Sequence, residues 1–159
     1  MKLKLICLLV LGFGLSAAAA PAKNTLEKDI KGTWVLKEVT CKGAKQALAM
    51  DYTLSFEGGK GAYVSKAKAC TQVEPELYTY PDASTVTIKQ GIRGCTPNPC
   101  QADMPDDRCG KETNPQTPAF KTELKDGGKT LILSTSDPKS IDCTDPGQSK
   151  PAVFTFVRQ

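Results

Sequence analysis

The sequence predicts an all-β domain of about eight antiparallel strands, closed into an up-and-down barrel and cross-linked by disulfides. Three observations support this prediction. From residue 32 onward, apolar and polar residues mostly alternate, as they do in strands with one buried face. Glycine-rich turns separate several of these segments, and six cysteines follow the N-terminal apolar stretch. No segment has the spacing of a long amphipathic helix.

The first 20 residues have the features of a cleavable signal peptide. A short basic segment precedes an apolar stretch at 5–15, and small residues follow at 16–20. Such a stretch is too short to span a bilayer. Cleavage between about residues 19 and 22 would give a secreted or periplasmic protein without a transmembrane segment. A membrane anchor or a lipoprotein modified at Cys7 fits less well, because Cys7 lies inside the apolar stretch.

The mature chain, residues 23–159, has the size of a single domain and little net charge. Loss of Lys2 and Lys4 reduces 21 basic residues to 19, against 17 acidic ones. This balance argues against nucleic acid as a partner. Histidine is absent, which removes the usual general base and the common catalytic triads. We therefore expect a monomeric protein that is not an enzyme and needs no cofactor.

The strands are expected to begin after a short polar turn or helix at 23–31, which places Leu26 and Ile30 on one face. The alternating segments that predict strands are 34–40, 52–57, 62–71, 76–80, 85–89, 120–125, 130–135 and 153–158. Glycines at 58–61 and 126–129 predict hairpin turns, because glycine readily adopts positive φ.

Strands that follow one another through short turns favour a barrel, because closure removes the exposed edges of a sheet. A two-sheet β-sandwich is the alternative. The pattern is interrupted by a cysteine- and proline-rich insertion at 91–118 and by a second proline-rich segment at 136–151. Long segments of this kind are often functional, but disulfides can also hold inert insertions in place.

The six cysteines of the mature chain predict a disulfide framework, because an exported chain folds in an oxidising compartment. They are Cys41, Cys70, Cys95, Cys100, Cys109 and Cys143. Six cysteines allow about 15 pairings, and the sequence does not choose among them. A zinc site is less favoured, since the spacings lack paired Cys-x2-Cys motifs and no histidine is present.

Gly32-Thr33-Trp34 opens the first expected strand, and Arg158 lies near the end of the last. The motif and the order of the strands resemble the lipocalins and related calycin-type barrels. The resemblance implies that Trp34 closes one end of the barrel and that Arg158 packs over its ring. It also implies a lipocalin-like exported domain, in which the two residues have a structural role.

The barrel interior is the first candidate binding site, because eight strands leave room for a filled core or one small ligand. Its expected inward-facing residues are Tyr52, Leu54, Phe56, Phe120, Leu124, Leu133, Phe154 and Phe156. Aromatic residues make up only 6% of the chain, so these side chains also suit a filled core.

The insertion at 91–118 offers two further candidates. If Cys95 and Cys100 were bridged, two prolines between them would hold a rigid loop suited to docking into a partner. The acidic residues of this segment lack the spacing of a calcium loop and are expected to face solvent; they are Asp103, Asp106, Asp107 and Glu112. We therefore expect no metal site.

The sequence thus predicts a non-catalytic extracytoplasmic protein that binds a small apolar ligand in its barrel. The alternative is a secreted or periplasmic enzyme inhibitor or protein-interaction module that acts through the 91–118 loop.

Overall fold

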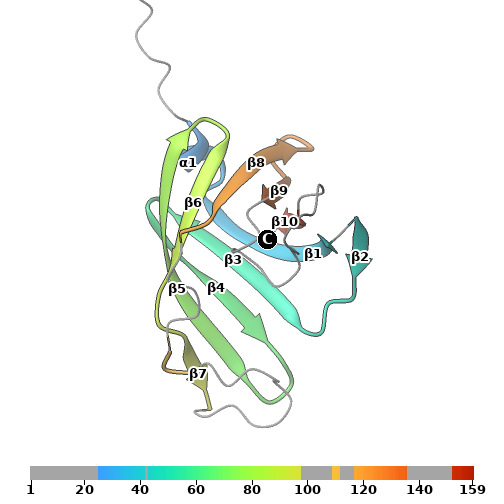
Figure 1. Ribbon diagram of the computed structural model, residues 1–159, viewed down its shortest axis with the longest axis vertical. Coiled ribbons are helices and arrows are strands. Elements are labelled where there is room, and N and C mark those ends of the chain that lie inside the picture. Colours follow the sequence, from blue (N-terminus) through green and yellow to red (C-terminus); the bar gives the residue numbers. More distant parts are fainter. Residues whose placement is uncertain (1–24, 42, 98–108, 112–116, 136–151) are drawn as a thin grey trace, which may run out of the picture.

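The computed structural model describes residues 25–41, 43–97, 109–111, 117–135 and 152–159, which form a closed antiparallel β-barrel (Figure 1). The elements, in chain order, are α1 (Leu26–Asp29), β1 (Gly32–Cys41), β2 (Ala44–Gln46), β3 (Asp51–Glu57), β4 (Lys60–Lys66), β5 (Thr71–Asp82), β6 (Thr85–Gln90), β7 (Gly94–Thr96), β8 (Ala119–Lys125), β9 (Thr130–Thr135) and β10 (Ala152–Arg158).

Eight of the strands form the barrel in sequential up-and-down order, and β10 closes it by pairing with β1. Trp34 lies opposite Arg158 in this closing pair, and Leu36 lies opposite Phe156. The predicted barrel is confirmed, and the alternative of a two-sheet β-sandwich is wrong. Such a barrel is consistent with the calycin-like fold.

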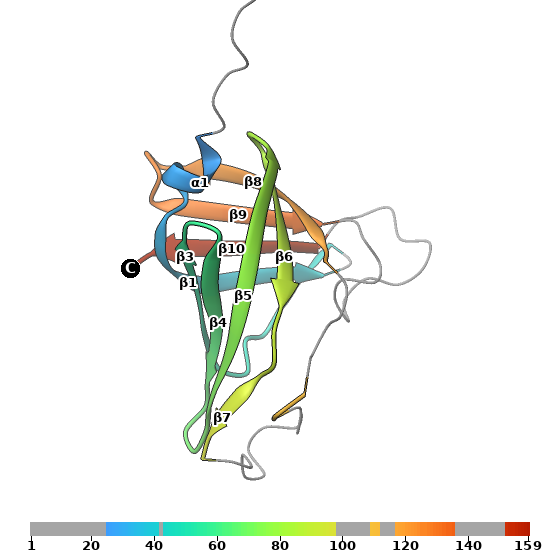
Figure 2. The same ribbon diagram turned by 90° about the vertical axis from the view of Figure 1, so that its left-hand side faces the viewer.

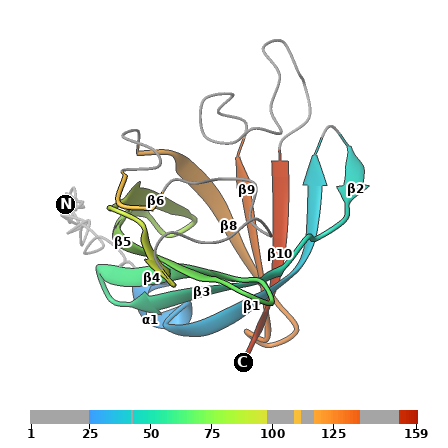
Figure 3. The ribbon, with the colours of Figure 1, turned by 90° about the horizontal axis from the view of Figure 1, so that it is seen from below.

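Two short strands lie outside the barrel (Figure 1), and Figure 3 shows β2 beside the end of β1. β2 pairs with the end of β1, whereas β7 pairs with the beginning of β5. Neither was predicted, because each has only three residues and no measurable alternation. α1 lies at the end of the barrel away from β7 (Figure 2) and buries the predicted pair Leu26 and Ile30.

The expected third strand at 62–71 is wrong in its end point. β4 stops at Lys66, and the Ala67 N–H donates to the Cys70 carbonyl at 2.9 Å, which closes a turn. β5 then starts at Thr71, five residues before the strand expected at 76–80. The sequence did not reveal this turn, because no glycine or proline marks it.

β5 presents polar side chains to the barrel interior and apolar ones to solvent. Gln72, Glu74 and Glu76 are buried, whereas Val73 and Leu77 are 42% and 51% exposed. Side chains alternate along a strand, so a single inward residue determines the face of all the others. That residue is the buried Tyr78, whose ring lies 4.5 Å from the ring of Phe56 in the core. Two carboxyl groups consequently lie inside the barrel.

Candidate functional site

The barrel contains a mostly apolar cavity of about 180 Å³. Its wall consists of Leu36, Leu54, Tyr63, Glu76, Ile88, Gln90, Pro118, Phe120, Leu133, Phe154 and Phe156. A second cavity, of about 320 Å³, shares Leu36, Tyr63 and Phe154 with it and extends to the segment around β2. The two cavities are therefore neighbours, with Glu76 and Gln90 as the polar side chains on the wall of the first.

Five of the eight predicted interior residues line the first cavity, namely Leu54, Phe120, Leu133, Phe154 and Phe156. Tyr52 lines the second cavity instead. Phe56 and Leu124 line neither, because Phe56 is fully buried against Tyr78 and Leu124 packs against the core. That these residues bind a ligand stays a prediction.

Glu76 and Gln90, the polar residues of the cavity, were missed by the sequence analysis. Glu76 begins the strand expected at 76–80, whereas Gln90 lies one residue beyond the strand expected at 85–89. One signal was available, because Gln72, Glu74 and Glu76 lie at even spacing from Tyr78. An aromatic residue prefers burial, so its phase indicated that these residues share the inner face.

The carboxyl group of Glu76 is bound to the hydroxyl of Tyr78, with 2.5 Å between Oε2 and Oη. The same hydroxyl lies 2.9 Å from the carbonyl oxygen of Ser55. A tyrosine hydroxyl has one proton and can donate only one of these bonds. When Tyr78 donates to Ser55, the contact with Glu76 is a hydrogen bond only if Glu76 carries the second proton.

The environment of Glu76 brings its protonation equilibrium into the neutral range, so the protonated and ionised forms coexist near pH 7. Burial raises its pKa from 4.5 to about 7, and the negative charge of Glu74 acts in the same direction. Hydrogen bonds from Tyr78 and Gln90 oppose the shift by stabilising the carboxylate. Burial also raises the pKa values of Tyr63 and Tyr78, so neither phenol ionises near neutral pH. Glu76 is thus the group on the wall that changes charge in this range.

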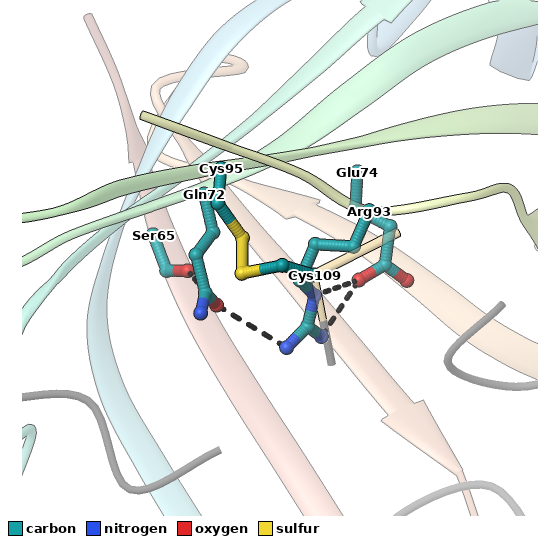
Figure 4. The surroundings of a disulfide bond; sticks show 6 residues. All are labelled: Ser65, Gln72, Glu74, Arg93, Cys95 and Cys109. Atoms are coloured by element: carbon teal, nitrogen blue, oxygen red, sulfur yellow. Dashed lines mark hydrogen bonds and ion pairs between the residues drawn. A yellow bond between two sulfur atoms is a disulfide. The ribbon is translucent and has the colours of Figure 1, made fainter. Parts of the chain in front are cut away.

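Glu74, two residues earlier, is in a different situation, because Arg93 forms an ion pair with it (Figure 4). Arg93 donates to Glu74 Oε2 from Nε at 3.0 Å and from Nη2 at 2.7 Å. Its Nη1 donates to the side-chain oxygen of Gln72 at 3.2 Å, and Ser65 donates to the same oxygen. The network balances the charge of Glu74 and leaves that of Glu76 without a cation among the described residues.

The backbone around Arg93 also determines one disulfide. Arg93 exchanges backbone hydrogen bonds with Gly110 and Lys111, so the chain returns beside β7. Cys109 thereby meets Cys95, with 5.6 Å between the Cα atoms (Figure 4). The hypothetical bridge between Cys95 and Cys100 is therefore wrong, because Cys95 is already paired.

Cys41 and Cys70 are buried and also disulfide-bonded. Cys100 and Cys143 lie outside the described residues, as do the leader at 1–20 and the acidic residues Asp103, Asp106, Asp107 and Glu112. Within the described ranges, no cluster of His, Cys, Asp and Glu has the arrangement of a metal site. No helix in this part of the chain is long and apolar enough to cross a bilayer.

The far end of the barrel contains the expected pair of Trp34 and Arg158. Arg158 lies over the indole ring, with its Cζ 4.3 Å from the ring centroid. Trp34 is fully buried and donates from Nε1 to the Ile30 carbonyl at 2.7 Å. Neither residue lines a cavity described above. Their contacts are those of a structural closure.

Comparisons of the chain with known protein families, curated proteins and solved structures give no match.

Proposed function

We propose that this protein is a non-catalytic, extracytoplasmic lipocalin-like protein that binds a small apolar ligand inside its barrel. The observation that carries the proposal is the cavity of about 180 Å³. Its wall is mostly apolar, with the polar side chains of Glu76 and Gln90. A dry apolar cavity of about 150 Å³ is sufficient to bind benzene. A ligand of about one ring fits the first cavity, and the adjoining one offers room for a substituent.

The lipocalin-like assignment is supported by Gly32-Thr33-Trp34, by the sequential order of the strands and by the position of Arg158 over Trp34. The extracytoplasmic location is supported by the leader-like first 20 residues and by the Cys95–Cys109 disulfide. The absence of histidine from the sequence supports a binding role rather than catalysis.

The alternative function is enzyme inhibition or protein interaction through the 91–118 loop. Ile92 supports it, because this side chain is 63% exposed next to the segment that Cys95 and Cys109 hold against β5. Because Cys95 pairs with Cys109, the rigid Cys95–Cys100 loop on which this alternative first rested does not form. The interior cavity is therefore the better supported site.

The test is titration of the full, disulfide-bonded chain with toluene, followed by NMR of its methyl groups. We expect saturable shifts at Leu54, Leu133 and Ile88, which line the cavity. Leu133→Phe should fill part of the cavity and weaken binding roughly tenfold or more, since about 1.4 kcal/mol corresponds to tenfold. Val73→Phe is the matched control, because Val73 faces solvent on β5. Absence of saturable shifts, or equal binding by the two variants, would refute an interior site.

A further inference from the structure

We propose that the cavity selects small ring-containing ligands that carry a basic nitrogen, which Glu76 binds as an ammonium ion. The inference rests on the proposed function and names the ligand class of the same site. It follows from the charges that face the cavity, from the hydrogen bonds of Glu76 and from the aromatic side chains that line the same cavity.

The charge on the cavity wall is of one sign. Among the described residues that line the cavity, Glu76 is the acidic one and none is a lysine or an arginine. Arg93, which contacts the buried side chains of β5, forms an ion pair with Glu74 at 2.7 Å. A ligand carboxylate in the cavity would therefore meet a like charge on Glu76 and no compensating cation among the described residues. Fatty acids and other anions are disfavoured on this ground.

The groups around Glu76 are arranged to stabilise its ionised form once a cation arrives. Tyr78 and Gln90 both form hydrogen bonds that favour the carboxylate. A ligand ammonium would add the missing opposite charge and further N–H donors, and the burial of Glu76 reduces the screening of this attraction by water. A ligand hydroxyl adds a hydrogen bond without the charge. The cavity should thus prefer an amine to an alcohol of the same shape.

The remainder of the wall suits an aromatic or aliphatic ring. Phe120 and Phe154 pack edge to face with their centroids 6.2 Å apart, and Phe156 also lines the cavity. Aromatic side chains bury an apolar ring favourably, and their faces also attract cations. Ring burial and charge recognition are therefore possible in one cavity of about 180 Å³.

Ligand binding should be linked to a proton on Glu76. Its pKa of about 7 means that the carboxyl group is mainly protonated at pH 5.5 and mainly ionised at pH 8. The other titratable or charged groups near it are Tyr63 on β4, Glu74 and Tyr78 on β5, and Arg93 through Glu74. The two tyrosines stay neutral over this range. An amine is protonated throughout, so its affinity should rise with pH as Glu76 ionises.

The experiment compares benzylamine, benzyl alcohol and benzoate by isothermal titration calorimetry at pH 8, using the full disulfide-bonded chain. These probes share one ring and differ in charge. We expect benzylamine to bind roughly tenfold more tightly than benzyl alcohol, and benzoate to bind most weakly. The affinity for benzylamine, but not for benzyl alcohol, should fall several-fold between pH 8 and pH 5.5.

Glu76→Gln keeps the shape of the side chain and removes its charge. We expect this variant to lose roughly tenfold in affinity for benzylamine and to bind benzyl alcohol within about twofold of the unmodified protein. Glu123→Gln is the matched control, because Glu123 is an exposed carboxylate on β8. That variant should keep the preference for the amine. The pH dependence of the unmodified protein is independent of whether Glu76→Gln folds.

The outcomes separate the inference from the proposed function. If toluene and benzyl alcohol bind in the cavity but benzylamine binds no more tightly, the inference is wrong and the proposed function stands. A benzylamine affinity that does not change with pH, or a preference retained by Glu76→Gln, overturns the inference as well. If neither toluene nor any of the three probes binds, both the inference and the proposed function are wrong.

Discussion

The guanidinium group of Arg158 covers the indole ring of Trp34 and joins three segments at one end of the barrel. Its Cζ lies 4.3 Å from the ring centroid. Nη1 and Nη2 donate to the carbonyls of Lys31 and Asp29 at 2.8 Å, and Nε donates to the Gly128 carbonyl at 2.9 Å. One side chain of the last strand therefore holds α1 and the β8–β9 turn in place.

Replacing this side chain should destabilise the fold more than an ordinary surface substitution does. We expect Arg158→Ala to lower the free energy of unfolding by about 2–4 kcal/mol, through loss of the cation–π contact and the hydrogen bonds. The stability of Arg158→Lys should lie between those of the unmodified protein and Arg158→Ala, because an ammonium lacks the planar set of N–H donors of a guanidinium. Urea denaturation measures the effect, with the exposed Lys37→Ala as control. Equal stability of Arg158→Ala and Lys37→Ala would contradict this structural role.

The buried carboxyl group of Glu76 makes stability depend on pH. Its pKa is raised from 4.5 to about 7 in the folded protein, so between these values the folded chain keeps a proton that the unfolded chain has lost. Its contribution to stability therefore falls as pH rises through this window.

Glu76→Gln cannot ionise and should escape this loss. We expect the variant to be more stable than the unmodified protein by roughly 2–3 kcal/mol at pH 8 and about equal to it at pH 4. Urea denaturation of both proteins at pH 4, 6 and 8 measures the difference. A stability difference that is the same at pH 4 and pH 8 would show that Glu76 does not titrate in this way.

Gly61 on β4 lies beneath the ring of Tyr78, and a side chain there has no space. A Cβ atom at this position would be 2.7 Å from Tyr78 Cε2 and would overlap the Ser55 carbonyl. We expect Gly61→Ala to cost about 3 kcal/mol of unfolding free energy, because backbone and ring must both shift. Gly59→Ala is the control, since its Cβ would make an ordinary contact 3.6 Å from the Tyr78 carbonyl. Thermal denaturation of the two variants should separate them; similar melting temperatures would argue against the close packing.

The ion pair of Arg93 and Glu74 should be costly to break from one side only. We expect Arg93→Met to lower stability by about 3–5 kcal/mol, because it removes the cation from a carboxylate that is 1% exposed. The double variant Glu74→Met/Arg93→Met should recover at least half of this loss, because no buried charge remains. The pair is assessed by urea denaturation of the single and double variants. A double variant less stable than Arg93→Met would show that the pair contributes more than charge balance.

Local pattern in the sequence was enough to predict the number and order of the barrel strands and, except at the boundary between β4 and β5, their approximate bounds. It also placed Leu26 and Ile30 on one face. These features depend on side-chain alternation and spacing and on turn residues, which neighbouring positions in the chain specify. The roles of Trp34 and Arg158 were instead implied by the resemblance to lipocalin-like barrels, and their contacts are consistent with it.

The tertiary structure decided which face of β5 points inward, and thereby the character of the cavity. Alternation groups Glu74, Glu76 and Tyr78 on one face and Val73 and Leu77 on the other, so Tyr78 favours burial of the first face and the two aliphatic residues favour burial of the second. Packing of Tyr78 against Phe56 and pairing with β4 decide between them. The partner of Cys95 was likewise decided by backbone bonds between Arg93 and residues 110–111, distant in sequence. Short-range pattern predicts the strands, whereas a buried carboxyl group and a disulfide pairing depend on contacts that form only when the chain closes on itself.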